Sequence, residues 1–396
     1  MKSSRFPLAA RMRSIEPFHV MEVLARAKAL EAAGRDIVHM EIGEPDFPTP
    51  RAVCEAGMRA LEKGELFYTP ALGMPELRAV IAGFYKTRYG VNVDASRIVI
   101  TSGSSGALLL AIAALVDPGK RVLLADPGYP ANRHFVRMME GVPVSVPVGA
   151  DGNYQMTPEL LEHYWDDQTV AALVATPSNP TGTLIPRGHL AAMARMVDQR
   201  GGALIVDEIY HGLVYDGAVD TALSVSENVF VINSFSKYFN MTGWRLGWMV
   251  APERYVRELD KLSQNVYLSA HTLSQFAALA AFEPATLAAL DARREEFRAR
   301  RDYLVPALRA LDFDIPQLPQ GAFYIYAGCA RLTQDSRRFA LDLLDQAGVA
   351  ITPGIDFGDN APCSHVRFAY TAGVERLREG VRRIGEFLDA KRAARV

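Results

Sequence analysis

The sequence is poor in cysteine, and its three cysteines, Cys54, Cys329 and Cys363, show no CxxC spacing. An odd number without that spacing argues against a disulfide framework and against a zinc site built from thiolates. We therefore expect free cysteine side chains, no bound metal, and a reducing compartment such as the cytoplasm.

Long apolar runs are also absent. The longest aliphatic stretch, residues 107–116, is shorter than the roughly 20 residues that cross a bilayer. The basic first residues, MKSSRFPLAARMRS, are followed by no apolar segment or small-residue cleavage site, so we expect them to form an arm of a soluble, cytoplasmic protein.

Neither sign of charge dominates, since 43 basic residues stand against 45 acidic ones and neither kind gathers into long runs. This balance argues against nucleic acid and against a membrane surface as partners. At 396 residues the chain exceeds the roughly 250 to 300 residues at which a single core stops growing, which favours two packed units.

Apolar strands alternate with helical segments from Arg97 onward, a pattern typical of a mostly parallel sheet covered by helices on both faces. The expected strands are 97–101, 121–126, 142–148, 170–176, 203–207 and 229–234, and the expected helices between them are 104–116, 131–140 and 188–199.

Beyond about Pro284 the sequence changes to charged amphipathic helix, then to strands near residues 323–328 and 366–370, and to a final helix rich in Arg and Glu. An earlier amphipathic helix is expected over 16–33, ending at Gly34. The prediction is an α/β fold with a large, mostly parallel sheet and a smaller α+β domain. Its expected regions are an N-terminal arm and helix over 1–45, a large domain over 46–284 and a small domain over 285–396.

The stretch SFSKYFNMTGWRLGW, residues 234–248, sets Lys237 among bulky apolar side chains and close to Ser234, Ser236 and Arg245. Lys237 directly follows an expected strand, so its amine should project from the carboxyl edge of the sheet, where ligands bind in open α/β folds. An amine whose pKa is lowered by its pocket can form a Schiff base, and Arg245 and the serines offer donors to a phosphate on a carbonyl cofactor. A structural salt bridge would explain one of these charges but not the cluster.

Gly103, Ser104 and Ser105 lie between an expected strand and a helix N-terminus, where free backbone N–H groups and the helix dipole favour an anion. Serine is also an ordinary helix cap, and this alternative stays open.

Asp207 closes an expected buried strand, and burial raises the pKa of a carboxylate unless a cation or a donor compensates. A protonated ring nitrogen would be such a partner. Asn179, in the loop PSNPTG after the preceding strand, offers a neutral donor and acceptor. The alternative is a proline-rich turn in which Asn179 bonds its own backbone.

Six motifs occur in order along the chain: IGEPDFPTP, YTPALGMPELR, DPGYP, PSNPTG, VDEIYHGLVY and SFSKYFNMTGWRLG. With these motifs the sequence resembles, from residue 41 to residue 370, the class I aminotransferases, which are fold type I pyridoxal 5′-phosphate (PLP) enzymes. The resemblance implies a ping-pong transfer of an amino group from an L-amino acid to a 2-oxo acid.

The resemblance also implies a role for each matching residue. Lys237 resembles the lysine that holds the cofactor as a Schiff base and shuttles the substrate proton. Asp207 matches the aspartate that keeps the pyridine nitrogen protonated, and Asn179 and Tyr210 match the donors to the phenolic oxygen. Tyr129 resembles the aromatic residue stacked on the ring.

For the cofactor phosphate, the resemblance points to one set of residues: Ser104, Ser105, Ser234 and Arg245, with Gly103 in the cradle and Ser236 as an addition. Arg367 is similar to the arginine that binds the substrate α-carboxylate, with Gly43 and Asn179 close to it. Tyr68 resembles a tyrosine that reaches the phosphate of the neighbouring subunit, which implies a homodimer.

Two other functions stay open on the same scaffold. One is β-elimination by a PLP-dependent carbon–sulfur lyase, and the other is a PLP-binding regulatory module. The substrate is open as well, since no second arginine for a side-chain carboxylate can be matched around residues 261–275. Alanine, aspartate, aromatic and branched-chain donors remain, with a lean towards neutral ones.

Overall fold

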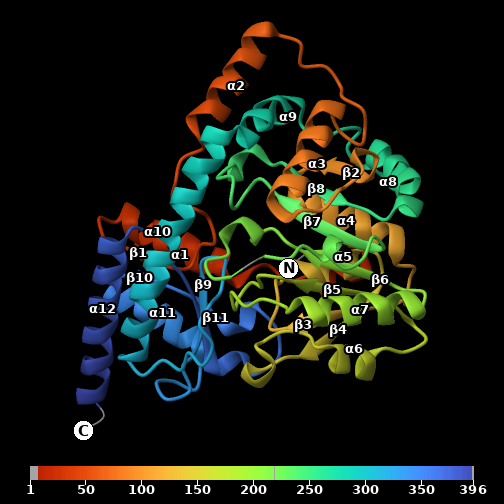
Figure 1. Cartoon of the computed structure of the whole chain (residues 1–396). Helices are drawn as coiled ribbons and strands as arrows, with labels where there is room; N and C mark the ends of the chain where they lie inside the picture. Colours follow the sequence, from red (N-terminus) through yellow and green to blue (C-terminus); the bar gives the residue numbers. More distant parts are fainter. Residues whose placement is uncertain (1–7, 218, 395–396) are drawn as a thin grey trace.

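The computed structural model describes residues 8–217 and 219–394, so the first seven residues of the expected arm lie outside the described residues. A seven-stranded sheet in the order β2-β8-β7-β6-β5-β3-β4 forms its centre (Figure 1). Strands β4, β3, β5, β6 and β7 pair in parallel, whereas β8 is antiparallel to both β2 and β7. The predicted α/β fold with a mostly parallel sheet is confirmed.

All the strands expected in this sheet are present, within one or two residues of the expected bounds. The bounds are β2 Ile98–Thr101, β3 Arg121–Asp126, β4 Val142–Pro147, β5 Thr169–Ala175, β6 Ala203–Asp207 and β7 Val229–Ser234. Strand β8, Gly247–Val250, was not predicted. It begins at the end of the Lys237 stretch and returns the chain antiparallel to β7.

Alternate residues of the central strands enter two separate apolar clusters, one on each face of the sheet. In β6, Leu204 and Val206 belong to one cluster, whereas Ala203 and Ile205 belong to the other. Strands buried on both faces need apolar residues at nearly every position, which is why these segments read as continuous apolar runs.

Helices cover both faces of the sheet. Residues of α4, α5 and α8 pack in one cluster, and residues of α3 and α7 pack in the other. The bounds are α2 Arg51–Lys63, α3 Pro75–Tyr89, α4 Gly103–Leu115, α5 Ala131–Met138, α6 Pro158–Tyr164, α7 Arg187–Gln199, α8 Glu253–Val266 and α9 Thr272–Leu279. Within the described ranges no single helix has the length and apolar composition to span a membrane, although one pair bent by 82°, Thr272–Phe282 with Pro284–Arg309, passes on those two criteria.

The remaining elements surround two smaller sheets. Strands β11, β12 and β9 form an antiparallel sheet, and β1 pairs with β10 in parallel. The strands are β1 Val38–His39, β9 Tyr324–Gly328, β10 Val349–Ala350, β11 Thr352–Pro353 and β12 His365–Ala369, and the helices are α1 His19–Ala32, α10 Pro284–Arg309, α11 Ser336–Ala347 and α12 Val374–Ala393. Helix α1, red in Figure 1, lies against this C-terminal part, because Val23 and Ala27 pack with Leu344 and Ala350.

The strand order positions the functional site. The chain goes outward from β3 to β4 and then returns to β5 on the other side of β3, so the direction of winding reverses between β3 and β5. In open α/β sheets ligands bind beyond the carboxyl ends of the strands at such a reversal. The loops that follow β3 and β5 meet there, next to the ends of β6 and β7.

Candidate active site

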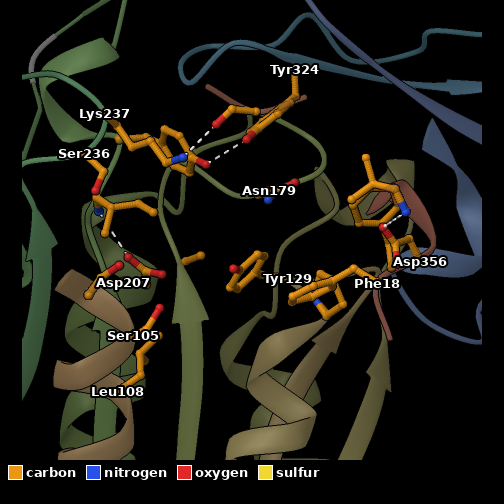
Figure 2. Close-up of a pocket in the computed structure, with 18 of the residues that line it drawn as sticks. Phe18, Ser105, Leu108, Tyr129, Asn179, Asp207, Ser236, Lys237, Tyr324 and Asp356 are labelled. Atoms are coloured by element: carbon orange, nitrogen blue, oxygen red, sulfur yellow. Dashed lines mark hydrogen bonds between the residues drawn. The ribbon is translucent and has the colours of Figure 1, made fainter. Parts of the chain in front are cut away.

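A cavity of about 270 Å³ lies at this edge of the sheet. Figure 2 shows Tyr129 and Asn179 between Lys237 and Asp207 on one side and Phe18 and Asp356 on the other. Eleven of the predicted site residues line the cavity: Gly43, Ser104, Ser105, Tyr129, Asn179, Asp207, Tyr210, Ser236, Lys237, Arg245 and Arg367. Gly103, Ser234 and Tyr68 are not among the lining residues.

Lys237 lies three residues beyond the end of β7. Its Nζ donates a hydrogen bond of 2.7 Å to the carbonyl oxygen of Gly43 and lies 5.8 Å from the centre of the Phe323 ring. Burial disfavours the charged amine and lowers the pKa of Lys237 to about 8. About a tenth of these amines are therefore neutral at pH 7, a far larger share than for a lysine in water.

Asp207 is the last residue of β6 and is buried. Its Oδ1 accepts a hydrogen bond of 3.2 Å from the backbone N–H of Ile209. Burial raises the pKa of Asp207 to about 7. A cation bound in the cavity next to Asp207 would favour the ionised carboxylate and reverse this shift.

Arg367 is buried in β12 and its guanidinium is fixed on several sides. One Nη donates to Asn179 Oδ1 at 2.9 Å and the other to the carbonyl oxygen of Glu41 at 2.6 Å. The guanidinium carbon lies 4.3 Å from the ring centre of Tyr324 and 4.9 Å from that of Phe357. Arg367 Nε has no hydrogen-bond partner among the described residues. A guanidinium held in one plane at the cavity wall suits a carboxylate.

Tyr210 completes this side of the cavity. Its hydroxyl group lies 3.0 Å from the hydroxyl of Tyr324, with which it shares a hydrogen bond. Both rings are buried. Tyr210 follows β6 and Tyr324 begins β9, so the bond joins the seven-stranded sheet to the three-stranded one.

The N-terminus of α4 and Arg245 form a cradle suited to an anion. Ser102, the N-cap residue of α4, makes no side-chain capping bond, so the N–H groups of the first turn are not capped by that side chain. Ser104 and Ser105 lie in this first turn. Arg245 holds a left-handed conformation (φ 52°), which is uncommon for residues other than glycine. These groups could bind a phosphate.

Two glycines allow the cradle to be this tight. A Cβ on Gly103, which has φ +73°, would lie 2.9 Å from Nη2 of Arg245. A Cβ on Gly247 would lie 2.7 Å from the backbone nitrogen of Ser104. Gly103 therefore lies behind the cavity wall and lets Arg245 approach the start of α4. Ser234 also lies behind the wall, and its buried Oγ accepts a 3.0 Å bond from the N–H of Ser236.

Sequence reasoning missed the side of the cavity formed by Phe18, Tyr324, Asp356 and Phe357. Phe18 stacks on Tyr129 with ring centres 6.0 Å apart. Asp356 is buried, and its carboxylate accepts bonds from the N–H groups of His19 (2.9 Å) and Val20 (3.2 Å). No local signal indicates this cap, because the partners are more than 330 residues apart in the chain.

Tyr68 lies outside the cavity, between α2 and α3, and is 81% exposed. Its neighbour Phe67 is 76% exposed, and Leu61 and Leu66 on the same segment are exposed as well. Nothing in a single chain brings Tyr68 to the site.

The residues present fit a small cofactor with a phosphate, an aromatic ring and an aldehyde. The α4 cradle suits the phosphate, and the neutral fraction of Lys237 suits an aldehyde carbon. The raised pKa of Asp207 would be lowered again by a cationic ring nitrogen, so Asp207 suits the ring. The guanidinium of Arg367, which also lines the cavity, suits a further carboxylate.

Comparison with known proteins gives a consistent result. The model of the family "Aminotransferase class I and II" matches residues 35–384. The chain is 41% identical over 379 residues to a valine–pyruvate aminotransferase of Mycobacterium tuberculosis, covering 95% of this chain and 97% of that one. It is 36% identical over 385 residues to a (5-formylfuran-3-yl)methyl phosphate transaminase of Methanocaldococcus jannaschii, covering 96% of this chain and 100% of that one. A crystal structure of an aminotransferase from M. tuberculosis superposes with a TM-score of 0.94 at 40% identity, covering 97% and 100% of the two chains.

Proposed function

The chain belongs to the class I and II aminotransferase family, and from this premise we propose the roles that its own residues take in the reaction. The family depends on PLP, and the chain is an aminotransferase that moves an amino group from an amino acid to a 2-oxo acid. The proposal concerns which side chains hold the cofactor, which move the proton, and which bind the substrate.

The cofactor would be held at four points. Its phosphate would lie in the α4 cradle, on Ser104, Ser105, Ser236 and Arg245, with Gly103 and Ser234 behind them. Its ring would lie against Tyr129, its ring nitrogen on Asp207 and its phenolic oxygen on Asn179 and Tyr210. When bound, PLP supplies an aldehyde carbon that exchanges amino groups and a ring that accepts an electron pair.

Lys237 would bind the aldehyde and then act as the base. Once an amino acid has displaced it, its amine is free to take the proton from the substrate α-carbon and to return a proton to the cofactor side. A pKa of about 8 supports this role, because the amine both accepts and releases protons near neutral pH. The second half of a ping-pong cycle uses the same transfers in reverse with a 2-oxo acid.

Arg367 would bind the substrate α-carboxylate. Its bonds to Asn179 and to the carbonyl of Glu41 fix the plane of the guanidinium, and its side chain lines the cavity. Gly43 keeps this part of the cavity narrow, since a Cβ there would lie 1.9 Å from the hydroxyl oxygen of Tyr324. The name of the M. tuberculosis relative makes valine and pyruvate the first pair to test.

We also propose a cytoplasmic homodimer in which Tyr68 reaches the phosphate of the neighbouring subunit. The exposed apolar segment around Tyr68 supports a contact with a second chain, and Arg245 at the cradle is itself exposed. The division into regions 1–45, 46–284 and 285–396 belongs to the same proposal.

The observation that carries these assignments is the meeting of Lys237, Asp207 and Arg367, from three distant segments, in one cavity. The test is a half-reaction with PLP-loaded protein and an amino acid, followed by absorbance. We expect pyridoxamine phosphate to form in the wild type and in the control Lys261→Ala, an exposed lysine on α8. Lys237→Ala should keep PLP and lose turnover by roughly 100-fold or more. Near-normal turnover in Lys237→Ala would overturn the proposal. So would, with cysteine as the amino acid, release of sulfide, pyruvate and ammonia in place of pyridoxamine phosphate.

A further inference from the structure

The first turn of α1 and the segment after β11 form one wall of the cavity, and this wall is apolar on its inner side. Phe18, Val20 and Met21 come from the start of α1, and Phe357 comes from the segment after β11. We call these four side chains the α1 wall. In Figure 2, Phe18 and Asp356 lie across the cavity from Lys237 and Asp207.

Hydrogen bonds within the wall and to the loop after β3 fix the position of the α1 wall. The carboxylate of Asp356 accepts the first N–H groups of α1, from His19 and Val20. The carbonyl oxygen of Phe357 accepts a 2.9 Å bond from the N–H of Gly128. The wall is thus held in place by hydrogen bonds and connects α1 to the loop after β3.

The buried carboxylate of Asp126 holds the rest of the same segment. It accepts bonds from the N–H groups of Asp359 at 2.9 Å and Asn360 at 3.2 Å. Gly358 packs so closely that a Cβ on it would lie 1.9 Å from Asp126 Oδ1. Asp126 therefore anchors Phe357 to the end of β3.

The α1 wall also lies next to the proposed carboxylate site. The ring centre of Phe357 is 4.9 Å from the guanidinium carbon of Arg367. Phe18, at the other end of the wall, stacks on Tyr129. A substrate with its α-carboxylate on Arg367 and its amino group at the cofactor therefore has the α1 wall within reach of its side chain.

The charges around the cavity disfavour an acidic side chain there. In the part of the chain that the structure describes, the cations lining the cavity are Lys237, Arg245 and Arg367, and each already has a proposed role. The charged group at the α1 wall is Asp356, whose two oxygens are taken by N–H groups of α1. Arg133 lies nearby, but it donates to the carbonyl oxygen of Asp356 and lines an adjoining cavity of about 40 Å³ that shares Phe357 with this one.

We propose that the amino donor is an amino acid with an apolar side chain, and that Phe18, Val20, Met21 and Phe357 bind that side chain and determine the specificity. This inference rests on the proposed function, since it takes Arg367 as the carboxylate site. An apolar side chain gains burial against the wall, whereas a second carboxylate would lose its water without gaining a cation.

The first experiment compares half-reactions of the PLP-loaded wild type with valine, leucine, alanine, aspartate and glutamate. We expect kcat/KM for leucine or valine to exceed that for aspartate and glutamate by about 100-fold or more, because an unpaired carboxylate is costly to bury. Equal kcat/KM for acidic and apolar donors would overturn the proposal that the α1 wall binds apolar side chains, and the proposed aminotransfer would still stand. No pyridoxamine phosphate with any donor would overturn the proposed function instead.

The second experiment changes the wall with a matched control. Met21→Arg places a cation at a position that lines the cavity and is 52% exposed, so the new charge need not be buried. The control Met12→Arg changes a methionine that is 49% exposed and does not line the cavity. We expect Met21→Arg to raise kcat/KM for glutamate about 10-fold relative to leucine, and Met12→Arg to leave the ratio unchanged. An unchanged ratio in both variants would overturn the assignment of Met21.

Phe18→Ala supplies a readout that a folding defect would not produce. We expect kcat/KM for leucine to fall about 10-fold or more, and that for alanine to change little, because alanine has almost no side chain to bind. Equal losses for both donors would show that Phe18 acts only through the structure. Arg133→Gln should leave the preference for apolar over acidic donors unchanged, and a changed preference would assign side-chain recognition to Arg133 instead.

Discussion

Replacing Asp207 with asparagine should stabilise the cofactor-free protein, and the gain should grow with pH. Burial raises the pKa of Asp207 from 3.8 to about 7. Between these two values the folded protein holds a proton that the unfolded chain has released, so stability falls as pH rises through this window. The loss amounts to about 4 kcal/mol at pH 8 and about 2 kcal/mol at pH 5.

Asparagine has nearly the same shape, keeps an oxygen for the N–H of Ile209, and does not titrate. The gain in unfolding free energy over the wild type should therefore increase by roughly 2 to 3 kcal/mol between pH 5 and pH 8. Urea unfolding of the cofactor-free proteins at both pH values measures it. Asp167→Asn, which changes an exposed aspartate, serves as the control and should show no such increase.

A gain that is equal at the two pH values, or a loss of stability at pH 8, would refute the reasoning that the buried carboxylate destabilises the cofactor-free fold. After PLP is added, the order of stability should reverse, because the wild type regains an ionised Asp207 opposite a ring cation. Asp207→Asn should also turn over substrate more slowly, because an amide cannot hold the ring nitrogen in its protonated form.

Three further predictions concern Arg367, Lys237 and Tyr68. Arg367→Lys should lower kcat/KM for every amino donor by about 10- to 100-fold, because it replaces the planar donor fork of arginine by a point charge. PLP binding, measured by absorbance, should stay unchanged, and an equal loss of PLP binding would mean that Arg367 has a structural role. The rate at which PLP reacts with Lys237 should rise tenfold per pH unit and level off near pH 8, because burial lowers the pKa of the Lys237 amine to about that value. A plateau near pH 10 would contradict this prediction. If Tyr68 acts across a dimer, dissociating the Lys237→Ala and Tyr68→Ala variants and letting them reassociate together should restore up to about a quarter of wild-type activity. About half of the dimers would then be mixed, and each mixed dimer would have one complete site. No recovery would place Tyr68 outside the site.

The central sheet could be predicted from the sequence because its signals are local. Strands such as β6 are buried on both faces, so their apolar runs stand out, and the end of each run locates residues such as Asp207 and Lys237. Strand β8 escaped prediction because it is only four residues long and its first two, Gly247 and Trp248, belong to the Lys237 stretch, which was interpreted as a functional segment.

The α1 wall could not be predicted in the same way. The helix expected over 16–33 begins at His19, because Asp356 accepts the N–H groups of His19 and Val20 and so sets the first turn. Because the capping carboxylate comes from the far end of the chain, the residues around the start of the helix give no sign of it. Tyr324 was placed on a strand correctly, but its bond to Tyr210 depends on how two sheets meet.

The cap on α1 also has a consequence for the order in which the site is made during synthesis. Lys237, Asp207 and the α4 cradle leave the ribosome well before Asp356 and Arg367, which come late in the chain. A growing chain therefore carries every proposed cofactor contact of its own sequence before it can close α1 over the cavity or bind a substrate carboxylate. The last residues proposed to hold the cofactor are thus synthesised about a hundred residues before Asp356 and Arg367, so the proposed carboxylate site is completed last.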